Sequence, residues 1–353
     1  MHARPADRRD RAAARAPATR RTRGTRLDDG QPVSLHGLLR DRAGDHACLG
    51  GWGAERWSGA WGAAPPKFVV SYDYHEPHSL DDALALLTRF GDDGHLMAGG
   101  TATVLLMRQG LLRPAHVVSL RTIDGLSGIA RTPQGGLRIG AMATHRAVER
   151  SDAARGYSPA LVDAFASVAT VRIRNQATVG GNLAHADPAQ DPPPMLAALN
   201  ATITVRSPRG ERTEAVETLA VDHFTTSLSH DEVITSVLLP PILPGTREVY
   251  LKFLPQTADD YATVSVAATL RFADDATVAD VRIVLGAVGP TTIRAKRVED
   301  ALRGARPTPE RIRDAAALVR DEVDPLDDLR GSADYKREMA RVWTERALAA
   351  LTR

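Results

Sequence analysis

The sequence predicts a globular fold of mixed helices and strands, divided into two or three domains. Short runs rich in β-branched and aromatic residues predict strands, and they alternate with stretches whose apolar residues recur at helical spacing. Of the 353 residues, 43% are hydrophobic and 25% are charged, which is typical of soluble globular proteins. A chain of this length corresponds to two or three domains of roughly 100–200 residues.

The composition argues against several classes of function. A net charge of only +2 gives no support for binding nucleic acid. The single cysteine, Cys48, excludes an internal disulfide, and it excludes an iron–sulfur cluster or zinc site with cysteine ligands from this chain alone. No apolar run approaches the ~20 residues that span a bilayer, so we expect a cytoplasmic protein without a membrane span.

Residues 1–66 are expected to form a disordered, arginine-rich arm. Residues 1–46 are rich in Arg, Ala and Asp and nearly lack large apolar side chains, so they cannot bury a core. Arg20 and Arg21 are not followed by a hydrophobic segment, which argues against an export signal. A reading frame that starts upstream of the true initiation site is an alternative explanation of the arm. We expect the folded protein to begin near Lys67.

The segment 67–121 is predicted to begin with a strand and a helix. Residues 68–72 are β-branched and aromatic, which favours a strand. Ser79 is a preferred N-cap residue, and Asp81 and Asp82 follow in the first turn, where the helix dipole favours acidic side chains. Apolar residues then recur at helical spacing to about Phe90.

A strand–glycine–helix unit is predicted next. Ala98-Gly99-Gly100-Thr101 separates an expected buried strand, which begins at His95, from an apolar helix at residues 102–107. Such a unit points backbone N–H groups and the positive end of the helix dipole toward an anion. A plain strand-to-helix turn is the alternative interpretation. Residues 114–120 are predicted to form a further strand.

The segment 122–243 is predicted to combine strands with short helices. Thr144 precedes a short helix, and Ser158-Pro159 opens a helix over residues 160–170 with proline at the tolerated first position. Asn200 is expected to end a third helix. The predicted strands are residues 126–129, 136–141, 201–205 and 232–240.

The most informative stretch of this segment is Ala177-Thr178-Val179-Gly180-Gly181-Asn182-Leu183-Ala184-His185-Ala186-Asp187-Pro188-Ala189-Gln190-Asp191. We expect a loop here, because adjacent glycines let a backbone bend sharply and approach a ligand closely. The N–H groups freed by such a bend form an anion-binding concavity, and Thr178 and Asn182 add hydrogen-bonding side chains. The stretch is a candidate cradle for a phosphate-bearing cofactor, with a tight turn and a solvated polar rim as the alternative.

Neither glycine motif matches the common nucleotide-binding fingerprints. A Rossmann fingerprint needs G-x-G-x-x-G between a strand and a helix, with an acidic residue about 20 residues further on. A Walker A loop needs Gly-Lys followed by Ser or Thr. The sequence therefore gives no support for a Rossmann or P-loop fold.

The segment 244–353 is predicted to form a sheet and three helices after a linker at residues 241–245. In the last helix, a stripe of four residues is expected to pack against the protein: Tyr335, Met339, Val342 and Leu348. The predicted strands are residues 249–253, 262–272 and 278–285. The predicted helices are residues 295–302, 309–320, with Thr308 as N-cap, and 333–351.

The two glycine motifs together resemble those of a known family. Ala98-Gly99-Gly100-Thr101, followed by the stretch from Arg174 to Asp191, is similar to the motif pair in the FAD-binding (medium) subunit of the molybdenum hydroxylases, the xanthine dehydrogenase and carbon monoxide dehydrogenase group. The resemblance implies an α+β fold with a vanillyl-alcohol-oxidase (PCMH)-type FAD-binding domain of two subdomains, about residues 67–121 and 122–243. It also implies a small C-terminal α+β domain, residues 244–353, with a three-stranded antiparallel sheet.

The resemblance also implies roles for the candidate site residues. The two motifs would wrap the pyrophosphate and ribose of FAD. Asp191 would accept hydrogen bonds from a cofactor hydroxyl or the loop backbone, and Ile234 would lie against the adenine or the ring edge. Lys252 would place a cation near the isoalloxazine, and Tyr261 would lie beside that ring. The implied FAD-binding residues are Ala98, Gly99, Gly100, Thr101, Ala102, Thr103, Thr178, Gly180, Gly181, Asn182, Asp191, Ile234, Lys252 and Tyr261.

Several of these positions have simpler explanations or depart from the family. Without the resemblance, a surface lysine is the favoured interpretation of Lys252, and an ordinary half-buried strand tyrosine is the alternative for Tyr261. Ala102 stands where the family commonly has an aspartate, which puts one polar contact in doubt. Pro255-Gln256 replaces the family's usual basic residue.

No residue pattern indicates acid–base catalysis or a metal site. His185 is the best single catalytic candidate, because histidine titrates near neutral pH, but without a paired nucleophile we expect it to organise the loop. A metal site of His185, Asp187 and Asp191 lacks a second histidine at ligand spacing. The chemistry is therefore expected to lie in the flavin, with the protein supplying position and electrostatics.

The resemblance implies an electron-transfer oxidoreductase subunit. A large molybdopterin-binding partner and a small partner with [2Fe-2S] clusters would supply electrons to FAD, which would pass them to NAD or another acceptor. The assembly would be a hetero-oligomer, a dimer of heterotrimers. A self-contained flavin oxidoreductase that acts on a small substrate is the first alternative. A ligand-binding module that kept the fold is the second.

Overall fold

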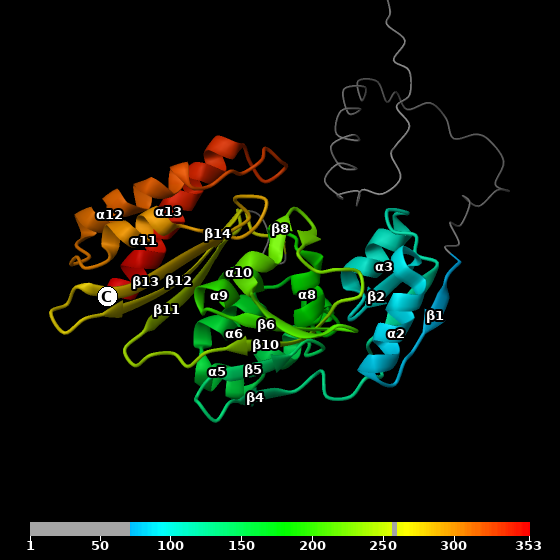
Figure 1. The fold of residues 1–353 in the computed structure, drawn as a ribbon. Coiled ribbons are helices and arrows are strands. Elements are labelled where there is room, and N and C mark those ends of the chain that lie inside the picture. The colour runs from blue at the N-terminus through cyan, green and yellow to red at the C-terminus, as the bar shows by residue number, and fades with distance from the viewer. Residues whose placement is uncertain (1–70, 256–259) are drawn as a thin grey trace, which may run out of the picture. The chain divides into compact units, whose positions relative to one another are not determined.

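The computed structural model describes residues 71–255 and 260–353 (Figure 1). The predicted arm and most of the predicted strand at residues 68–72 lie outside this part of the chain. Three sheets with their helices follow one another along the described sequence, and a two-stranded hairpin, β8 (Ala220–Asp222) with β9 (Thr225–Thr226), is a minor fourth. Within the described residues, no helix combines the length and apolarity needed to cross a membrane.

The first sheet is small and parallel. Its order is β1 (Asp73–His75), β3 (His116–Ser119), β2 (Gly94–Met97). Within the described residues, the first strand starts at Asp73, where the Asp73 N–H donates to the Ala115 carbonyl (2.9 Å). The strand that begins at Gly94 is half-buried throughout, so the expectation of a buried strand is wrong.

The helix α2 (Leu80–Phe90) covers this sheet, as the sequence predicts. Ser79 adopts extended backbone angles, and its hydroxyl accepts the Asp82 N–H at 3.0 Å, which caps the helix. The buried side chains of α2 form one hydrophobic cluster with residues of β3, of the position just after it, and of the central sheet. The buried members of that cluster are Ala83, Leu84, Leu87, Val118, Leu120 and Val233. After β2 the chain enters α3 (Thr101–Arg108).

The second sheet is antiparallel and forms the centre of the described chain. Its order is β4 (Ile129–Arg131), β5 (Leu137–Gly140), β10 (Val233–Leu239), β6 (Thr202–Ser207), β7 (Gly210–Ala215). Its helices are α4 (His145–Glu149), α5 (Asp152–Tyr157), α6 (Pro159–Ala166), α7 (Val171–Arg174), α8 (Val179–His185), α9 (Pro192–Ala198) and α10 (Val216–Leu219). Thr144 and Ser158 cap α4 and α6, as predicted.

Two details of this region differ from the sequence-based expectation. Helix α6 ends at Ala166 instead of residue 170, and Ala169 takes a left-handed backbone conformation (φ 38°). The Arg174 side chain accounts for this early end, because its Nη1 donates to the Val168 and Ala169 carbonyls at 2.8 and 2.7 Å. The prolines that follow Asp191 form the first turn of α9, where their lack of an N–H is tolerated.

The third sheet is antiparallel, with the order β11 (Arg247–Phe253), β12 (Val264–Phe272), β13 (Val278–Gly286), β14 (Ile293–Arg294). The three predicted strands are present, and a two-residue fourth strand is added. The helices α11 (Lys296–Leu302), α12 (Pro309–Ala317) and α13 (Ala333–Thr352) lie on one side of this sheet (Figure 1), whereas α9 packs against β12 and β13. Alternate residues of β12 therefore face different hydrophobic cores. Ala267 belongs to the core of the central sheet, and Val266 belongs to the core under the C-terminal helices.

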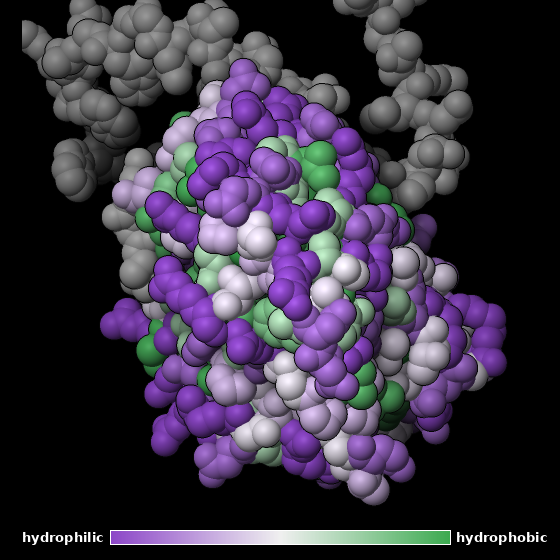
Figure 2. Space-filling model, turned by 90° about the vertical axis from the view of Figure 1, so that its left-hand side faces the viewer, coloured by the Kyte–Doolittle hydropathy of each residue, from purple (hydrophilic) through white to green (hydrophobic). Residues whose placement is uncertain are grey.

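Of the predicted packing stripe of α13, Leu348 is buried and the half-buried Met339 packs against the core, whereas the rest of the buried face was not predicted. Tyr335 is 39% exposed, and the other two members of the expected stripe are only half-buried. The buried face instead consists of Lys336, Ala340, Thr344, Ala347, Leu348 and Leu351. Small side chains allow close packing of the helix, and the Lys336 ammonium is satisfied by the Leu326 carbonyl (2.8 Å). Hydrophilic residues predominate on the face shown in Figure 2, with hydrophobic ones scattered among them.

We expect Leu161→Ala to lower the free energy of unfolding by about 2–5 kcal/mol, because it leaves a cavity in the fully buried core of the central sheet. Urea denaturation followed by circular dichroism measures this change. Leu329→Ala is the matched control, since the Leu329 side chain is fully exposed, and it should change the free energy by less than about 0.5 kcal/mol. Equal losses in the two variants would contradict this placement of Leu161.

Candidate functional site

The two glycine motifs, far apart in sequence, are in contact in the structure. A Cβ built on Gly99 would lie 1.9 Å from the Gln176 carbonyl oxygen, which directly precedes the second motif. A Cβ built on Gly181 would lie 3.4 Å from the Cβ of Ala98 in the first motif. Glycine at position 99 is therefore required by a backbone-to-backbone contact, and this contact brings the motifs together.

The glycine pair of the second motif lies in a helix and not in a loop. Thr178 is the N-cap of α8, and its hydroxyl accepts the Gly181 N–H at 3.2 Å. The N–H groups of Val179 and Gly180 donate to the Ala143 and Ala141 carbonyls at 3.0 and 2.8 Å. The expectation that this pair frees backbone N–H groups for an anion is therefore wrong. Close packing explains Gly180 instead, because its Cβ would lie 2.7 Å from the Cβ of Ala141.

The first motif keeps the geometry that the sequence predicts. Gly100 has a left-handed conformation (φ 73°) and is the N-cap of the eight-residue helix α3, without a capping side-chain hydrogen bond. The first-turn N–H groups of a helix lack acceptors inside it, so those of Thr101, Ala102 and Thr103 are available to a ligand. Of the two motifs, the first thus supplies the anion-binding helix end.

Arg174 fixes the turn that leads into the second motif. It is buried, and its Nε donates to the Glu149 Oε2 at 3.0 Å while its Nη1 holds two carbonyls of the turn. Burial opposes ionisation of Glu149, but the guanidinium groups of Arg146 and Arg174 outweigh it and lower the pKa of this carboxyl. No role was predicted for Arg174, although this residue begins the stretch that carries the resemblance.

The second group of site residues converges on the carboxylate of Asp191. The Tyr250 hydroxyl donates to Oδ1 at 2.5 Å, and the Lys252 ammonium donates to Oδ2 at 2.9 Å. The same ammonium donates to the Ser167 carbonyl at 2.8 Å. The resemblance implied a cofactor hydroxyl or the loop backbone as the donor to Asp191, whereas the donors in the described chain are these two side chains. The interpretation of Lys252 as a surface lysine is wrong, because its side chain is only 8% exposed.

Burial governs the ionisation of this group. It raises the pKa of Asp191 to about 6, although the Lys252 charge and the Tyr250 hydrogen bond act in the opposite direction. Burial and the nearby Asp191 charge raise the pKa of Tyr250 well above its ordinary value. Tyr250 was missed by the sequence analysis. Its position two residues before Lys252 on a strand, and hence on the same face, was the available signal.

Tyr261 lies at the edge of this group. Its side chain is 44% exposed, and the Arg330 guanidinium lies 5.4 Å from the centre of its ring. Burial and the Asp187 carboxylate raise the pKa of Tyr261 to about 12. The motif's own Asp187 therefore lies near a residue of the C-terminal segment. Gln256, which departs from the family, lies outside the described residues.

The remaining predicted residues have other surroundings. Ile234 is buried in the core of the central sheet, beside a register shift between β10 and β6. The His185 ring lies 5.3 Å from that of Phe224, and burial lowers its pKa, with Asp187 opposing. The Phe224 N–H donates to the Ala186 carbonyl at the end of α8. These contacts agree with an organising role for His185.

Two buried side-chain oxygens of the second motif lack a hydrogen-bond partner in the described chain. The side-chain oxygens Oδ1 of Asn182 and Oε1 of Gln190 have no hydrogen-bond partner within residues 71–255 and 260–353. An unpaired buried polar atom costs about 1–3 kcal/mol, so a water molecule or a bound ligand that supplies the partner is favoured here. Together with the uncapped start of α3, they fit a cofactor that carries both phosphates and hydroxyls.

Comparison with protein families gives two matches that follow one another along the chain. The model described as "FAD binding domain in molybdopterin dehydrogenase" matches residues 70–242. The model described as "CO dehydrogenase flavoprotein C-terminal domain" matches residues 249–351. The motif pair and the residues around Asp191 all fall within these two matches.

Individual relatives agree. The carbon monoxide dehydrogenase medium chain of Hydrogenophaga pseudoflava is 33% identical over 286 residues, which are 81% of this chain and 97% of that protein. The xanthine dehydrogenase FAD-binding subunit of Escherichia coli O157:H7 is 27% identical over 277 residues, 78% of this chain and 94% of that protein. A structure of the H. pseudoflava carbon monoxide dehydrogenase has a TM-score of 0.77 and 34% identity, and it covers 79% of this chain and 96% of that chain.

We expect Asp191→Asn to remove a pH-dependent part of the stability. The pKa of Asp is about 3.9 in an unfolded chain, and that of Asp191 in the folded chain is about 6. At pH values between these two, the folded chain keeps a proton on Asp191 that the unfolded chain releases. The stability that Asp191 contributes is thus full below the unfolded pKa and is lost as the pH rises through about 6. The difference in unfolding free energy between wild type and variant should fall by roughly 2–3 kcal/mol across this window.

Urea denaturation at a series of pH values measures this difference. Asp314→Asn, at an exposed carboxylate of α12, is the control and should give a curve parallel to that of the wild type. Parallel curves for Asp191→Asn as well would show that Asp191 titrates alike in the folded and unfolded chains.

Proposed function

Because the chain belongs to the family of FAD-binding medium subunits of molybdenum hydroxylases, we propose that it transfers electrons from partner iron–sulfur clusters through FAD to NAD or another acceptor. Family membership itself makes the chain an oxidoreductase subunit with an FAD-binding domain. It confirms the resemblance, the α+β fold class and the FAD cofactor that the sequence predicted. The route of the electrons, the acceptor and a cytoplasmic location are the further steps of the proposal.

The contact between the two glycine motifs is the observation that supports a dinucleotide site most strongly. The uncapped first turn of α3, at Thr101, Ala102 and Thr103, offers N–H donors to the pyrophosphate. The Asn182 amide, with its unpaired Oδ1, offers a polar contact beside it. Thr178, Gly180 and Gly181 contribute by capping α8 and by letting it pack closely, rather than by donating N–H groups themselves.

The residues around Asp191 are proposed to lie on the flavin side. FAD supplies the redox chemistry when bound, and the protein sets the charge around it. Lys252 is held in place by Asp191 and by the Ser167 carbonyl, so the position of its ammonium is fixed by two hydrogen bonds. Tyr261, half-exposed beside Arg330, offers an aromatic surface. This arrangement supports Lys252 and Tyr261 as the side chains nearest the ring.

Partner subunits are proposed from the relatives and from the cysteine count. The relatives include medium chains of carbon monoxide dehydrogenases and the FAD-binding subunit of a xanthine dehydrogenase. The single cysteine of this chain cannot ligate an iron–sulfur cluster that needs four cysteine thiolates. A small partner therefore carries the clusters, and a large partner carries the molybdopterin. We propose a dimer of heterotrimers for the whole assembly.

We expect Gly99→Ala to weaken FAD binding by at least about tenfold, because the added Cβ cannot fit against the Gln176 carbonyl and forces the two motifs apart. Titration of the flavin-free protein with FAD, followed by flavin fluorescence, measures the affinity. Gly156→Ala is the matched control: that helical glycine has no atom within 4 Å of the added Cβ, so FAD affinity should not change.

A second variant separates FAD contact from packing. Asn182→Ala removes an amide whose Oδ1 makes no hydrogen bond within the described chain, so its melting temperature without FAD should stay close to that of the wild type while FAD affinity falls. If both Gly99→Ala and Asn182→Ala bind FAD with the affinity of the wild type, FAD does not bind at the two glycine motifs.

The electron-transfer proposal is tested with the native complex and with the isolated chain. Purification of the tagged chain from its source should bring down a large and a small partner, and anaerobic NADH should bleach the flavin absorbance of the isolated, FAD-loaded chain. If the isolated chain oxidises a small organic substrate at the rate of any complex, it is a self-contained oxidoreductase and the proposal is wrong.

A further inference from the structure

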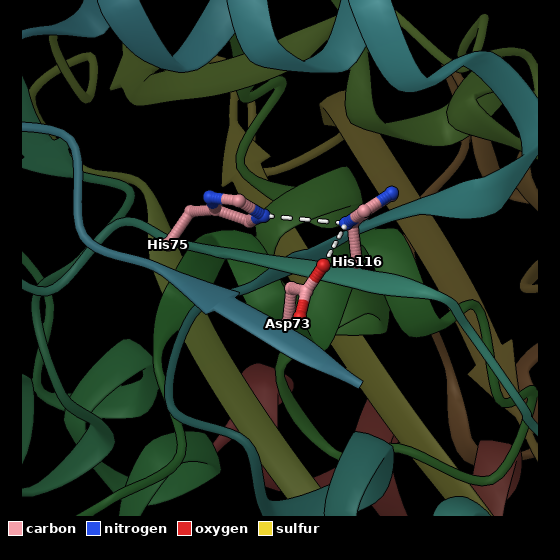
Figure 3. Close-up of side chains that lie close together, drawn as sticks. All are labelled: Asp73, His75 and His116. Atoms are coloured by element: carbon pink, nitrogen blue, oxygen red, sulfur yellow. Dashed lines mark hydrogen bonds and ion pairs between the residues drawn. The ribbon is translucent and has the colours of Figure 1, made fainter. Parts of the chain in front are cut away.

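A cluster of three side chains of the types that bind metal ions lies away from the glycine motifs, on the small parallel sheet (Figure 3). Asp73 and His75 are two residues apart on β1 and so share a face of the sheet. His116 on β3 is the direct register partner of Asp73. Sequence reasoning missed this group, because β1 and β3 are about forty residues apart and meet only in the folded sheet.

The distances between the three side chains match a metal site. His75 Nε2 lies 3.3 Å from His116 Nδ1, which in turn lies 3.3 Å from Asp73 Oδ2. Two ligands at 2.0–2.1 Å from a tetrahedral zinc ion lie about 3.3–3.4 Å apart. All three ligand atoms lie within 4.8 Å of one another, and the Asp73 side chain, 75% exposed, has room to turn and close the third separation.

Hydrogen bonding alone satisfies this group poorly. The same nitrogen, Nδ1 of His116, faces both His75 and Asp73, as the two dashed lines in Figure 3 show. One ring nitrogen carries either a hydrogen or a lone pair in the plane of the ring, so it cannot donate to one neighbour and accept from another. A cation placed among the three atoms instead accepts a lone pair from each of them.

The surroundings hold the imidazoles and leave one side open. The Phe90 ring stacks on His116 with centroids 3.9 Å apart and an angle of 18° between the rings, and it lies 4.8 Å from the His75 ring. His116 retains 26% exposure and Asp73 far more, so solvent reaches the group. Three protein ligands with an open position for water are typical of accessible zinc sites, and imidazole nitrogen favours zinc-like ions over Mg²⁺ or Ca²⁺.

We propose that Asp73, His75 and His116 bind one divalent transition-metal ion, with Zn²⁺ as the representative ion. The ion joins the short edge strand β1 to β3. The cluster lies where the parallel strands begin, since Gly94 at the start of β2 pairs with His116. The first glycine motif follows the opposite end of β2. The proposed metal site and the proposed FAD site therefore lie at opposite ends of the same sheet.

Zinc titration of the full-length, metal-free protein against a chromogenic chelator tests the proposal. The wild type should bind one Zn²⁺ more per chain than the double variant His75→Ala/His116→Ala, and each single variant should weaken that site at least about tenfold. His78→Ala is the matched control, an exposed histidine of the same segment outside the cluster, and it should bind Zn²⁺ like the wild type.

Two further measurements keep the outcome independent of variant stability. Circular dichroism and FAD content show that each variant is folded, and Co²⁺ added to the wild type should give the intense visible absorption of a tetrahedral site. Equal zinc stoichiometry and affinity in wild type and folded double variant would overturn the proposal. If the double variant does not fold, the lack of a tetrahedral Co²⁺ spectrum in the wild type would overturn it.

Discussion

The site depends on the hydrogen bonds that the buried carboxylate of Asp191 accepts from Tyr250 and Lys252. Asp191 ends the second motif, stands at the start of α9, and receives hydrogen bonds from Tyr250 and Lys252 of the third sheet. A buried charge is tolerated only when it is paired and hydrogen-bonded, so the strand carrying these donors must stay in register with the motif. The Lys252 ammonium extends the contact to Ser167, next to the turn that Arg174 holds. One chain of polar contacts thus connects the C-terminal sheet to the entrance of the second motif.

The glycines of the two motifs illustrate two different uses of the residue. Gly100 is needed for its left-handed backbone conformation, which turns the chain into α3. Gly99, Gly180 and Gly181 have ordinary conformations, and the lack of a Cβ matters because another backbone or side chain occupies that space. A sequence shows that glycines are adjacent but not which use applies. The prediction was therefore wrong at the second motif, where the glycines lie in a helix and not in a loop, and right at the first motif, where a helix starts after Gly100.

The correct predictions share a local cause. Ser79, Thr144, Ser158 and Thr308 cap their helices because capping involves residues within three positions of each other. The errors depend on contacts beyond the reach of a helix cap. The end of α6 depends on Arg174, the buried face of α13 on the sheet that it covers, and β14 on pairing with β13. The family resemblance identified the cofactor, but the contact of Tyr250 with Asp191, 59 residues away, becomes visible only in the folded chain.

The protonation of Asp191 decides whether Lys252 acts as a net positive charge. When Asp191 is ionised, the two side chains form a neutral pair, and the field of the ammonium on a nearby group is largely cancelled. When Asp191 is protonated, its Oδ2 still accepts the hydrogen bond, but the ammonium charge is uncompensated. Burial raises the pKa of Asp191 to about 6, so a modest change in the surroundings shifts the balance near neutral pH. A negative charge placed beside Lys252 would raise the pKa of Asp191 further, and proton uptake by this carboxyl would offset part of that charge.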